Sequence, residues 1–387
     1  MIPYSRQEIT EQDIAEVEKI LRSDFLSQGP TVSRFEESIA NYCGVSHTIA
    51  VNSATSALHI SCLALGLGPG DWLWTSPNTF VASANCGLYC GADIDFVDID
   101  PKTYNMSVTA LSEKLIIAEK IGKLPKIVIP VHFAGQPCDM PAIKDLSKRY
   151  GFKIIEDASH AIGASYNKIK VGSCIHSDIT VFSFHPVKII TTAEGGIALT
   201  NNKSIADKIS RLRTHGITSD KTKMEKRPKD EIWNYQQIEL GFNYRMNDIQ
   251  AALGLSQLSR LDKYIKRRHE IAKYYDNELR DLPILLPLQP PNVYSSYHLY
   301  PILIKTNSDF KNQKQLYNEL RENDIAANLH YTPVHRHPYY ENLGFKKNDF
   351  PIAEQFHQNV ISIPLYAILP DIHQEHVIDT LKKIMSV

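Results

Sequence analysis

Between about residues 46 and 200, short apolar runs alternate with segments of helical spacing, a pattern that few folds can satisfy. The apolar runs are 47–51, 94–97, 126–131, 153–155, 179–182 and 196–200. Helical patterns such as 56–65 and 140–149 lie between several of them. This alternation predicts an α/β domain with a mostly parallel sheet, whose ligands bind at the carboxyl ends of the strands. We therefore expect the chemically important residues just after strands.

The 387 residues are enough for one large and one smaller domain. A long helix from about 247 to 279 is predicted by apolar residues at helical spacing. Beyond it lie strand candidates at 298–304, 325–330 and 360–363 and helix candidates near 311–322 and 372–385. We predict a large α/β domain with an N-terminal helical segment over 1–246, and the linking helix with a small α+β domain over 247–387.

The composition excludes several classes of protein. Lys and Arg total 42 against 43 Asp and Glu, so net charge does not favour nucleic acid or a membrane surface as a partner. The N-terminus does not resemble a signal sequence and no apolar run could span a bilayer, so a cytoplasmic protein is expected. The six cysteines form no C-x-x-C pair, which suits buried free thiols. The charged segment 217–238 is interpreted as an exposed loop, with a substrate-gating segment as the alternative.

Lys188 is the lysine best placed for covalent chemistry. It follows the apolar run 179–184, stands between Val187 and Ile189, and precedes a diglycine. A lysine among apolar groups tends toward the neutral amine, which can attack a carbonyl and form a Schiff base, as in enzymes that use pyridoxal phosphate. The alternative is a strand-end lysine whose ammonium reaches water.

Three further segments could complete a pyridoxal phosphate site. Residues 52–57 join a strand to a helix and could bind a phosphate, although they could equally be a Ser/Thr helix cap. Asp157 follows the strand 153–155 and could pair with the protonated ring nitrogen of the cofactor, or could cap a helix. Phe80 could stack on a flat cofactor or belong to the core.

Six motifs then follow one another along the chain. They are Asn-Ser-Ala-Thr-Ser-Ala-Leu-His (52–59), Glu-Asp-Ala-Ser-His-Ala-Ile-Gly (156–163), Phe-Ser-Phe-His-Pro-Val-Lys (182–188), Glu-Gly-Gly (194–196), Arg-Thr-His-Gly (213–216) and Gly-Phe-Asn-Tyr-Arg-Met (241–246). In order and spacing they resemble the DegT/DnrJ/EryC1/StrS family of sugar-nucleotide aminotransferases over essentially the full length. The resemblance implies the fold of type I pyridoxal phosphate enzymes, with a mostly parallel seven-stranded sheet flanked by helices and a smaller C-terminal α+β domain.

The resemblance also implies a role for each matching residue. Lys188 is similar to the Schiff-base lysine and Asp157 to the partner of the ring nitrogen. The implied cofactor contacts are Ala54, Thr55 and Ser183 at the phosphate, Phe80 and His160 at the ring, and Asn243 from the other subunit of a homodimer. One branch of the family carries histidine in place of the lysine and removes a hydroxyl group. This chain keeps Lys188, with His185 three residues earlier, so the dehydratase interpretation loses its main support.

The implied reaction moves an amino group from L-glutamate, through pyridoxamine 5'-phosphate, to the keto carbon of a nucleotide-linked sugar. Shorter motifs at 2–7, 26–30 and 184–196 resemble the aminotransferases of bacterial pseudaminic acid biosynthesis. These act at C4 of UDP-2-acetamido-2,6-dideoxy-β-L-arabino-4-hexulose and give UDP-4-amino-4,6-dideoxy-N-acetyl-β-L-altrosamine. The alternative is another UDP- or dTDP-linked keto sugar, because small changes in a sugar pocket can redirect specificity.

Candidate substrate contacts follow from the same resemblance. They are Tyr4, Arg6, Gln28, Gly29, Pro30, Arg213, His215, His330, Tyr331 and His335. No metal site is assigned, because the histidines at 330, 335 and 337 have no cysteine or acidic set nearby. A non-catalytic relative is expected to lack Lys188 or Asp157, and both are present. A nucleotide-sugar oxidoreductase needs a G-x-G-x-x-G turn, and none is apparent.

Overall fold

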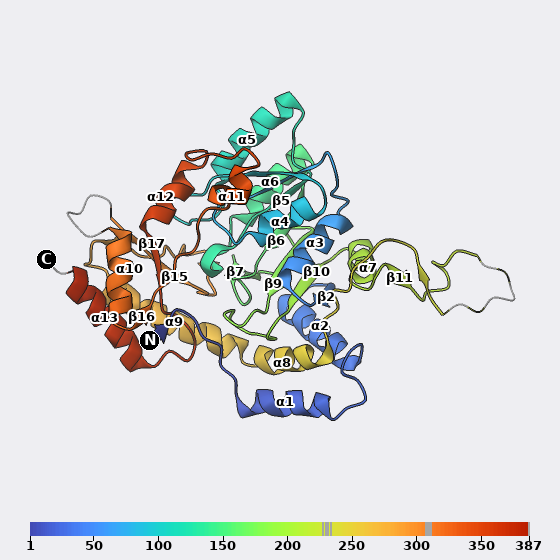
Figure 1. Cartoon of the computed structure of the whole chain (residues 1–387), viewed down its shortest axis with the longest axis horizontal. Helices are drawn as coiled ribbons and strands as arrows, with labels where there is room; N and C mark the ends of the chain where they lie inside the picture. Colours follow the sequence, from blue (N-terminus) through green and yellow to red (C-terminus); the bar gives the residue numbers. More distant parts are fainter. Residues whose placement is uncertain (227, 229–231, 233, 306–311, 386–387) are drawn as a thin grey trace.

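The computed structural model describes residues 1–387 apart from 227, 229–231, 233, 306–311 and 386–387. A seven-stranded sheet forms its centre (Figure 1). From edge to edge the strands are β2 (His47–Val51), β10 (Gly196–Thr200), β9 (Ile179–Ser183), β6 (Lys153–Asp157), β5 (Ile127–Ile129), β3 (Trp72–Thr75) and β4 (Asp93–Phe96). Strand β10 runs opposite to the other six strands of this sheet, which are parallel to one another. The predicted α/β class with a mostly parallel seven-stranded sheet is therefore confirmed.

Helices cover both faces of this sheet. Alternate side chains of a strand point to opposite faces, and since the side chains on both faces are apolar, both faces must be covered. One face carries α3 (Ala54–Ala64), α4 (Ala82–Tyr89) and α7 (Lys203–Leu212). The other carries α5 (Val108–Ile121), α6 (Met140–Tyr150), α2 (Pro30–Cys43) and α8 (Asp248–Leu258). Both faces of the sheet are thus buried, which explains why its strands read as continuous apolar runs rather than as alternating ones.

Strand β3 was not among the strands expected from the sequence. It pairs in parallel with β4 on one side and β5 on the other. Its four residues, Trp-Leu-Trp-Thr, are too short a run to show periodicity, and Pro77 follows closely. The strand is specified by its two neighbours rather than by its own pattern.

The single helix expected over 247–279 is two helices, so this prediction was wrong in its continuity. Helix α8 ends at Leu258 and α9 spans Leu261–Glu278. Between them the Arg260 guanidinium turns back to bind the buried carboxylate of Asp13 at 2.7 Å. The break lets α8 pack on α1 (Glu11–Leu21), while α9 contributes to the C-terminal core.

The C-terminal core is built on a second, antiparallel sheet of β13 (Ile284–Leu285), β15 (Tyr300–Ile304) and β17 (Val360–Ile363). Helices α10 (Gln313–Glu322) and α13 (Asp371–Met385) pack beside it. The strand expected at 325–330 is much shorter, β16 (Ile325–Ala326), and it pairs in parallel with β1 (Ile2–Pro3). Beyond it, Asn328 bridges to Ser362 of β17, and the N–H of Val334 donates to the carbonyl of Pro77, just after β3, at 2.9 Å. The division at 246 and 247 stays a prediction.

The remaining elements are short. They are β7 (Ser165–Tyr166), β8 (Ile169–Lys170) and β14 (Val293–Tyr294) in one small sheet, β11 (Ile217–Thr218) with β12 (Gln236–Gln237), helices α11 (Pro338–Glu341) and α12 (Pro351–Asn359), and the 3-10 turns Phe133–Gly135 and Val334–Arg336. The segment with the paired strands β11 and β12 extends away from the rest of the molecule (Figure 1). Most described residues between the two strands are exposed, as expected for 217–238. Residues 227, 229–231 and 233 of that segment lie outside the described residues. Among the described helices, none has both the length and the apolarity needed to cross a membrane.

Candidate active site

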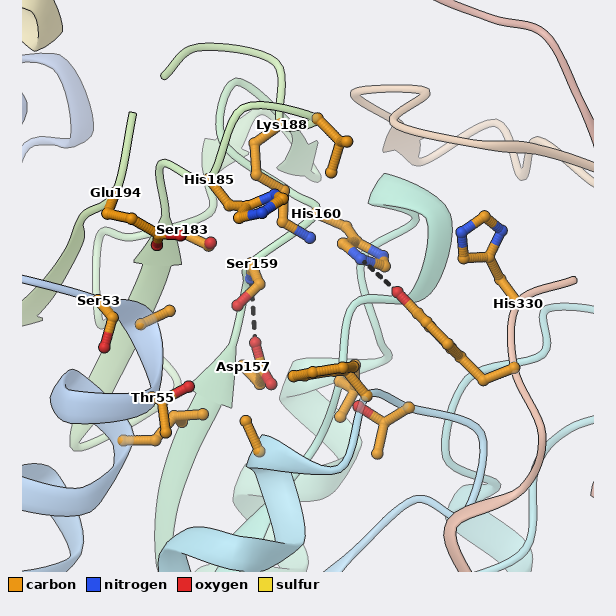
Figure 2. A pocket seen from close by; sticks show the side chains of 18 of the residues that line it. Ser53, Thr55, Asp157, Ser159, His160, Ser183, His185, Lys188, Glu194 and His330 are labelled. Atoms are coloured by element: carbon orange, nitrogen blue, oxygen red, sulfur yellow. Dashed lines mark hydrogen bonds between the residues drawn. The ribbon is translucent and has the colours of Figure 1, made fainter. Parts of the chain in front are cut away.

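A cavity of about 540 Å³ opens at the carboxyl end of the central sheet. Segments from distant parts of the chain line it, among them the N-terminal segment at Tyr4, the start of α3, residues 79–82, the loops after β6 and β9, and residues 328–331. Figure 2 shows many of these side chains around the cavity. The sheet edge is where the sequence predicted that ligands would gather, and Lys188, Asp157, Thr55, Ser183, His160 and Phe80 all reach this one cavity.

The first turn of α3 forms one wall. Ser53 is the extended N-cap residue, and its hydroxyl accepts the N–H of Ser56 at 3.1 Å. The N–H groups of Ala54 and Thr55 have no partner among the described residues, and the first turn carries no acidic side chain. The positive end of the helix dipole therefore faces the cavity, as an anion site requires. At Gly196 a Cβ would lie 2.4 Å from the Ala54 nitrogen, so only glycine lets β10 pass this close beneath the turn.

Asp157, the last residue of β6, is a buried carboxylate held by two donors. Its Oδ1 accepts the backbone N–H of Ser159 at 3.1 Å (Figure 2), and its Oδ2 accepts the hydroxyl of Ser83 at 2.6 Å. No cationic side chain among the described residues lies within ion-pair distance of it. Ser83 was missed from the sequence; the only available signal was a hydroxyl four residues after Thr79, to which it also bonds.

Lys188 lies in the loop after β9, and its backbone N–H donates to the carbonyl of His185 at 2.8 Å. The neighbouring carbonyl of Val187 accepts the buried hydroxyl of Ser5 at 2.9 Å, which ties this loop to the N-terminal segment. The side chain points into the cavity (Figure 2). Burial lowers the pKa of the Lys188 amine from 10.5 to about 8, although the charge of Asp157 acts in the opposite direction. About a tenth of the amine is therefore neutral and nucleophilic at pH 7, a far larger share than in a solvated lysine.

This pKa predicts how the cofactor-free protein captures pyridoxal phosphate. The capture rate should rise about tenfold per pH unit below pH 8 and level off above it, because only the neutral amine attacks the aldehyde. Stopped-flow absorbance across pH 6 to 10 measures this profile, with a Lys188→Ala protein as the blank. A midpoint near 10, the value for a solvated lysine, would contradict a buried reactive amine.

Histidine and tyrosine side chains form the wall opposite α3. His160 Nε2 lies 3.1 Å from the hydroxyl of Tyr331 (Figure 2), and its ring packs on that of His298 at 4.3 Å between centroids. Burial, and then the charge of Lys188, lower the pKa of His160 well below its ordinary value, so the imidazole is neutral. His330 and Tyr4 pack against each other beside Tyr331.

Other predicted contacts lie outside the residues that line this cavity. His335 is buried instead against Phe350, with its Nε2 2.9 Å from Glu354. The guanidinium of Arg213 binds Glu36 and the carbonyl of Ala50. The remaining ones are Arg6, Gln28, Pro30, His215 and Asn243, which are exposed, and Gly29, whose N–H donates to Asp248. Within one chain, the predicted substrate contacts that reach the cavity are Tyr4, His330 and Tyr331.

The residues present fit pyridoxal phosphate. A helix N-terminus without an acidic partner suits its phosphate, and a buried carboxylate without a cation suits its protonated ring nitrogen. Phe80 is 61% exposed at the cavity, an unusual place for a phenylalanine unless a flat group covers it. The half-buried amine of Lys188 faces the same space. Among the described residues no group of three His, Cys, Asp or Glu side chains could hold a metal ion.

Comparison with known proteins agrees with this chemistry. The profile of the DegT/DnrJ/EryC1/StrS aminotransferase family matches residues 7–382. The chain belongs to this family. The chain is similar to the Campylobacter jejuni UDP-4-amino-4,6-dideoxy-N-acetyl-beta-L-altrosamine transaminase, with 38% identity over 100% of this chain and 98% of that protein. The Bacillus subtilis spore coat polysaccharide biosynthesis protein SpsC is 37% identical over 100% of this chain and 97% of its own length.

Solved structures of similar proteins have the same fold. Helicobacter pylori PseC, an aminotransferase involved in pseudaminic acid biosynthesis, superposes with a TM-score of 0.89 at 32% identity, over 99% of both chains. The PLP form of a Streptococcus pneumoniae protein named as a sugar aminotransferase, Spr1654, gives a TM-score of 0.88 at 32% identity over 99% of this chain and 98% of that one. The aminotransferase family and the fold expected from the sequence motifs are thus confirmed.

Proposed function

We propose that this aminotransferase uses pyridoxal 5'-phosphate to move an amino group from L-glutamate to C4 of UDP-2-acetamido-2,6-dideoxy-β-L-arabino-4-hexulose. The product is UDP-4-amino-4,6-dideoxy-N-acetyl-β-L-altrosamine, on the route to pseudaminic acid. The observation that carries the proposal is the convergence of three groups on one cavity: the Lys188 amine, the Asp157 carboxylate, which has no cation beside it among the described residues, and the N-terminus of α3. The choice of sugar is supported by the full-length similarity to the C. jejuni and H. pylori proteins.

In this proposal the chain's own residues bind the cofactor, orient its ring and keep its ring nitrogen protonated. The N–H groups of Ala54 and Thr55, with the hydroxyl of Ser183, bind the cofactor phosphate. Asp157 keeps the ring nitrogen protonated, because a buried carboxylate strongly favours a cationic partner. Phe80 covers one face of the ring. When bound, the cofactor supplies an electron sink and carries the amino group between the two half-reactions.

Lys188 has two tasks. Its neutral amine anchors the cofactor through its aldehyde carbon, and once released it is the base positioned to take a proton from the α-carbon of the amino donor. The same amine then returns that proton, so one residue serves as acid and base. A pKa of about 8 suits both directions near neutral pH, since neither the protonated nor the neutral form is rare.

We also propose a homodimer in which Asn243 reaches the cofactor phosphate of the partner subunit. Asn243 is exposed, yet it pairs with Thr214 next to the contact between Val51 and Arg245, at the end of the strand that leads into the phosphate turn. An amide so close to this turn but directed to the surface suits a site shared between two chains. The six cysteines are free and buried, which supports the proposed cytoplasmic setting.

A panel of nucleotide sugars tests the proposal. With L-glutamate as donor, the UDP-linked 4-keto sugar should be aminated, and the mass of the sugar nucleotide should change accordingly. The expected preference over dTDP-linked 4-keto-6-deoxy sugars is at least about tenfold in kcat/KM, because the acetamido group and the base each add contacts. Light scattering on the same preparation should give twice the chain's mass.

Amination of a dTDP-linked sugar alone would overturn the choice of substrate but not the reaction class. That outcome would favour the alternative function, amination of another keto sugar for a surface polysaccharide. The similarity to SpsC is the observation that favours this alternative. Absence of any amino transfer from glutamate, with cofactor bound, would overturn the proposed donor.

A further inference from the structure

The hydrogen bonds of His160 fix which of its nitrogens carries the proton. Its Nδ1 lies 3.3 Å from the backbone nitrogen of Ala134, which can only donate. Nδ1 must therefore accept, and in a neutral imidazole the proton is then on Nε2. Because Nε2–H points at the hydroxyl of Tyr331, the tyrosine oxygen is the acceptor in that bond.

The surroundings hold His160 in this orientation. Ala134 adopts a left-handed conformation with φ 56°, and this conformation turns its N–H toward the imidazole. Its carbonyl is fixed in turn by the N–H of His298 at 2.9 Å. On the other side the hydroxyl of Ser296 binds the carbonyl of His160 at 2.7 Å. The ring and the backbone of His160 are thus anchored by two separate segments.

His330 has the opposite tautomer for a similar reason. The side-chain oxygen of Asn328 accepts the N–H of Leu329 at 2.8 Å, so the NH₂ end of that amide faces His330 Nε2 at 3.4 Å. Nε2 therefore accepts, and Nδ1–H donates to the hydroxyl of Ser362 at 2.9 Å. Burial, and then the charge of Lys188, lower the pKa of His330 to about 3, so it stays neutral. Both ring nitrogens are used inside the protein.

These two assignments leave Tyr331 with a hydrogen to donate. A phenol hydroxyl has one hydrogen, and this hydrogen cannot be donated to a nitrogen that is already protonated. The hydroxyl has no other partner among the described residues, and Tyr331 lines the cavity with Lys188. Burial, and then nearby Tyr4 and Asp157, raise the pKa of Tyr331, so it keeps this hydrogen. His330, with its ring 4.9 Å from that of Tyr331, limits how the phenol can turn.

We propose that Tyr331 donates a hydrogen bond to the oxygen of the carbonyl group that gains or loses nitrogen, and that His160 and His330 are positioning residues that set the direction of this hydroxyl. The proposal rests on the proposed function, because both half-reactions pass through such a carbonyl. A neutral donor suits an oxygen on which charge develops only during reaction. A carboxylate is the poorer fit, since Lys188 is the only lysine or arginine among the described residues that line the cavity.

The tautomers can be measured without cofactor or substrate. In protein labelled with ¹⁵N histidine, long-range proton–nitrogen correlation should show His160 protonated only at Nε2 and His330 only at Nδ1 at neutral pH. Assignment uses the His160→Gln and His330→Phe proteins, each of which loses one imidazole. If His160 is protonated at Nδ1, Tyr331 must donate to it and has no hydrogen left for a ligand, and the proposal fails.

Kinetics test the donor itself. Tyr331→Phe should slow both half-reactions by about 10²-fold while KM for the nucleotide sugar changes less than about threefold. His160→Leu should cause a similar loss. His160→Gln should recover most of the rate, because its amide offers an acceptor to Ala134 and a donor to Tyr331.

The glutamate half-reaction separates the two proposals, since it needs no sugar. If it proceeds in the wild type and the panel shows another sugar, the proposed substrate fails while Tyr331 can still be judged. The role of Tyr331 as hydrogen-bond donor is overturned if the Tyr331→Phe protein carries out this half-reaction within about threefold of the wild-type rate. It is also overturned if the substitution raises only KM for the sugar.

Discussion

Replacing Lys188 with alanine is expected to reduce amino transfer by at least about 10⁴-fold while the fold is kept. The change removes both the amine that anchors the cofactor and the base that moves the proton, and each contribution alone is large. Stability should change little, because the side chain is half-buried and makes no hydrogen bond or ion pair with the described residues. Single-turnover absorbance with glutamate and thermal unfolding measure the two effects.

Lys120→Ala is the matched control for this change. Lys120 is an exposed lysine near the end of α5, and its removal should leave turnover within about twofold. A Lys188→Ala protein that retains more than a hundredth of wild-type turnover would show that another group carries the proton, and the assignment of Lys188 would be wrong.

Asp157→Asn is expected to lower kcat by about 10²- to 10³-fold, since the amide is nearly the same shape but cannot keep the ring nitrogen of the cofactor protonated. A second effect follows in the cofactor-free protein. The charge of Asp157 raises the pKa of Lys188, so its removal should move the midpoint of the capture profile below pH 8. Steady-state kinetics and the stopped-flow profile report the two effects independently.

Ser83→Ala provides the comparison, because it removes one donor to the carboxylate and leaves the charge in place. Its expected loss is about tenfold, the size of one hydrogen bond to a charged group. If Asp157→Asn and Ser83→Ala cost the same, the charge is not what matters at this position. An unchanged midpoint for Lys188 in Asp157→Asn would separately contradict the electrostatic link between the two residues.

The sequence predicts the large domain well because its signals are local. Apolar runs bounded by helical spacing mark the strands, and residues placed just after strands meet at one edge of a parallel sheet. Thr55, Asp157 and Lys188 are found in one cavity for this reason. Strand β3 has no such signal, since its four residues are specified by two neighbouring strands and carry no pattern of their own.

The wall opposite α3 could not be derived from local signals. His160 and Tyr331 are 171 positions apart, and the direction of the hydrogen bond between them depends on the left-handed backbone of Ala134. Nothing in an alanine indicates such a conformation, which is more common for glycine and asparagine. His335 illustrates the converse: its position in a histidine-rich segment resembled a substrate contact, while the fold pairs it with Glu354.

The first residues of the chain limit how modular this enzyme can be. Ile2 and Pro3 pair with Ile325 and Ala326, while Ser5 holds the loop of the reactive lysine. If residues 247–387 were replaced by those of a relative, the new strand at 325–326 would have to pair with Ile2 and Pro3 of the original protein. The N-terminal segment that carries Ser5 would stay fitted to the original C-terminal part. Exchange of substrate preference between relatives would require the N-terminal segment and the C-terminal part to be transferred together.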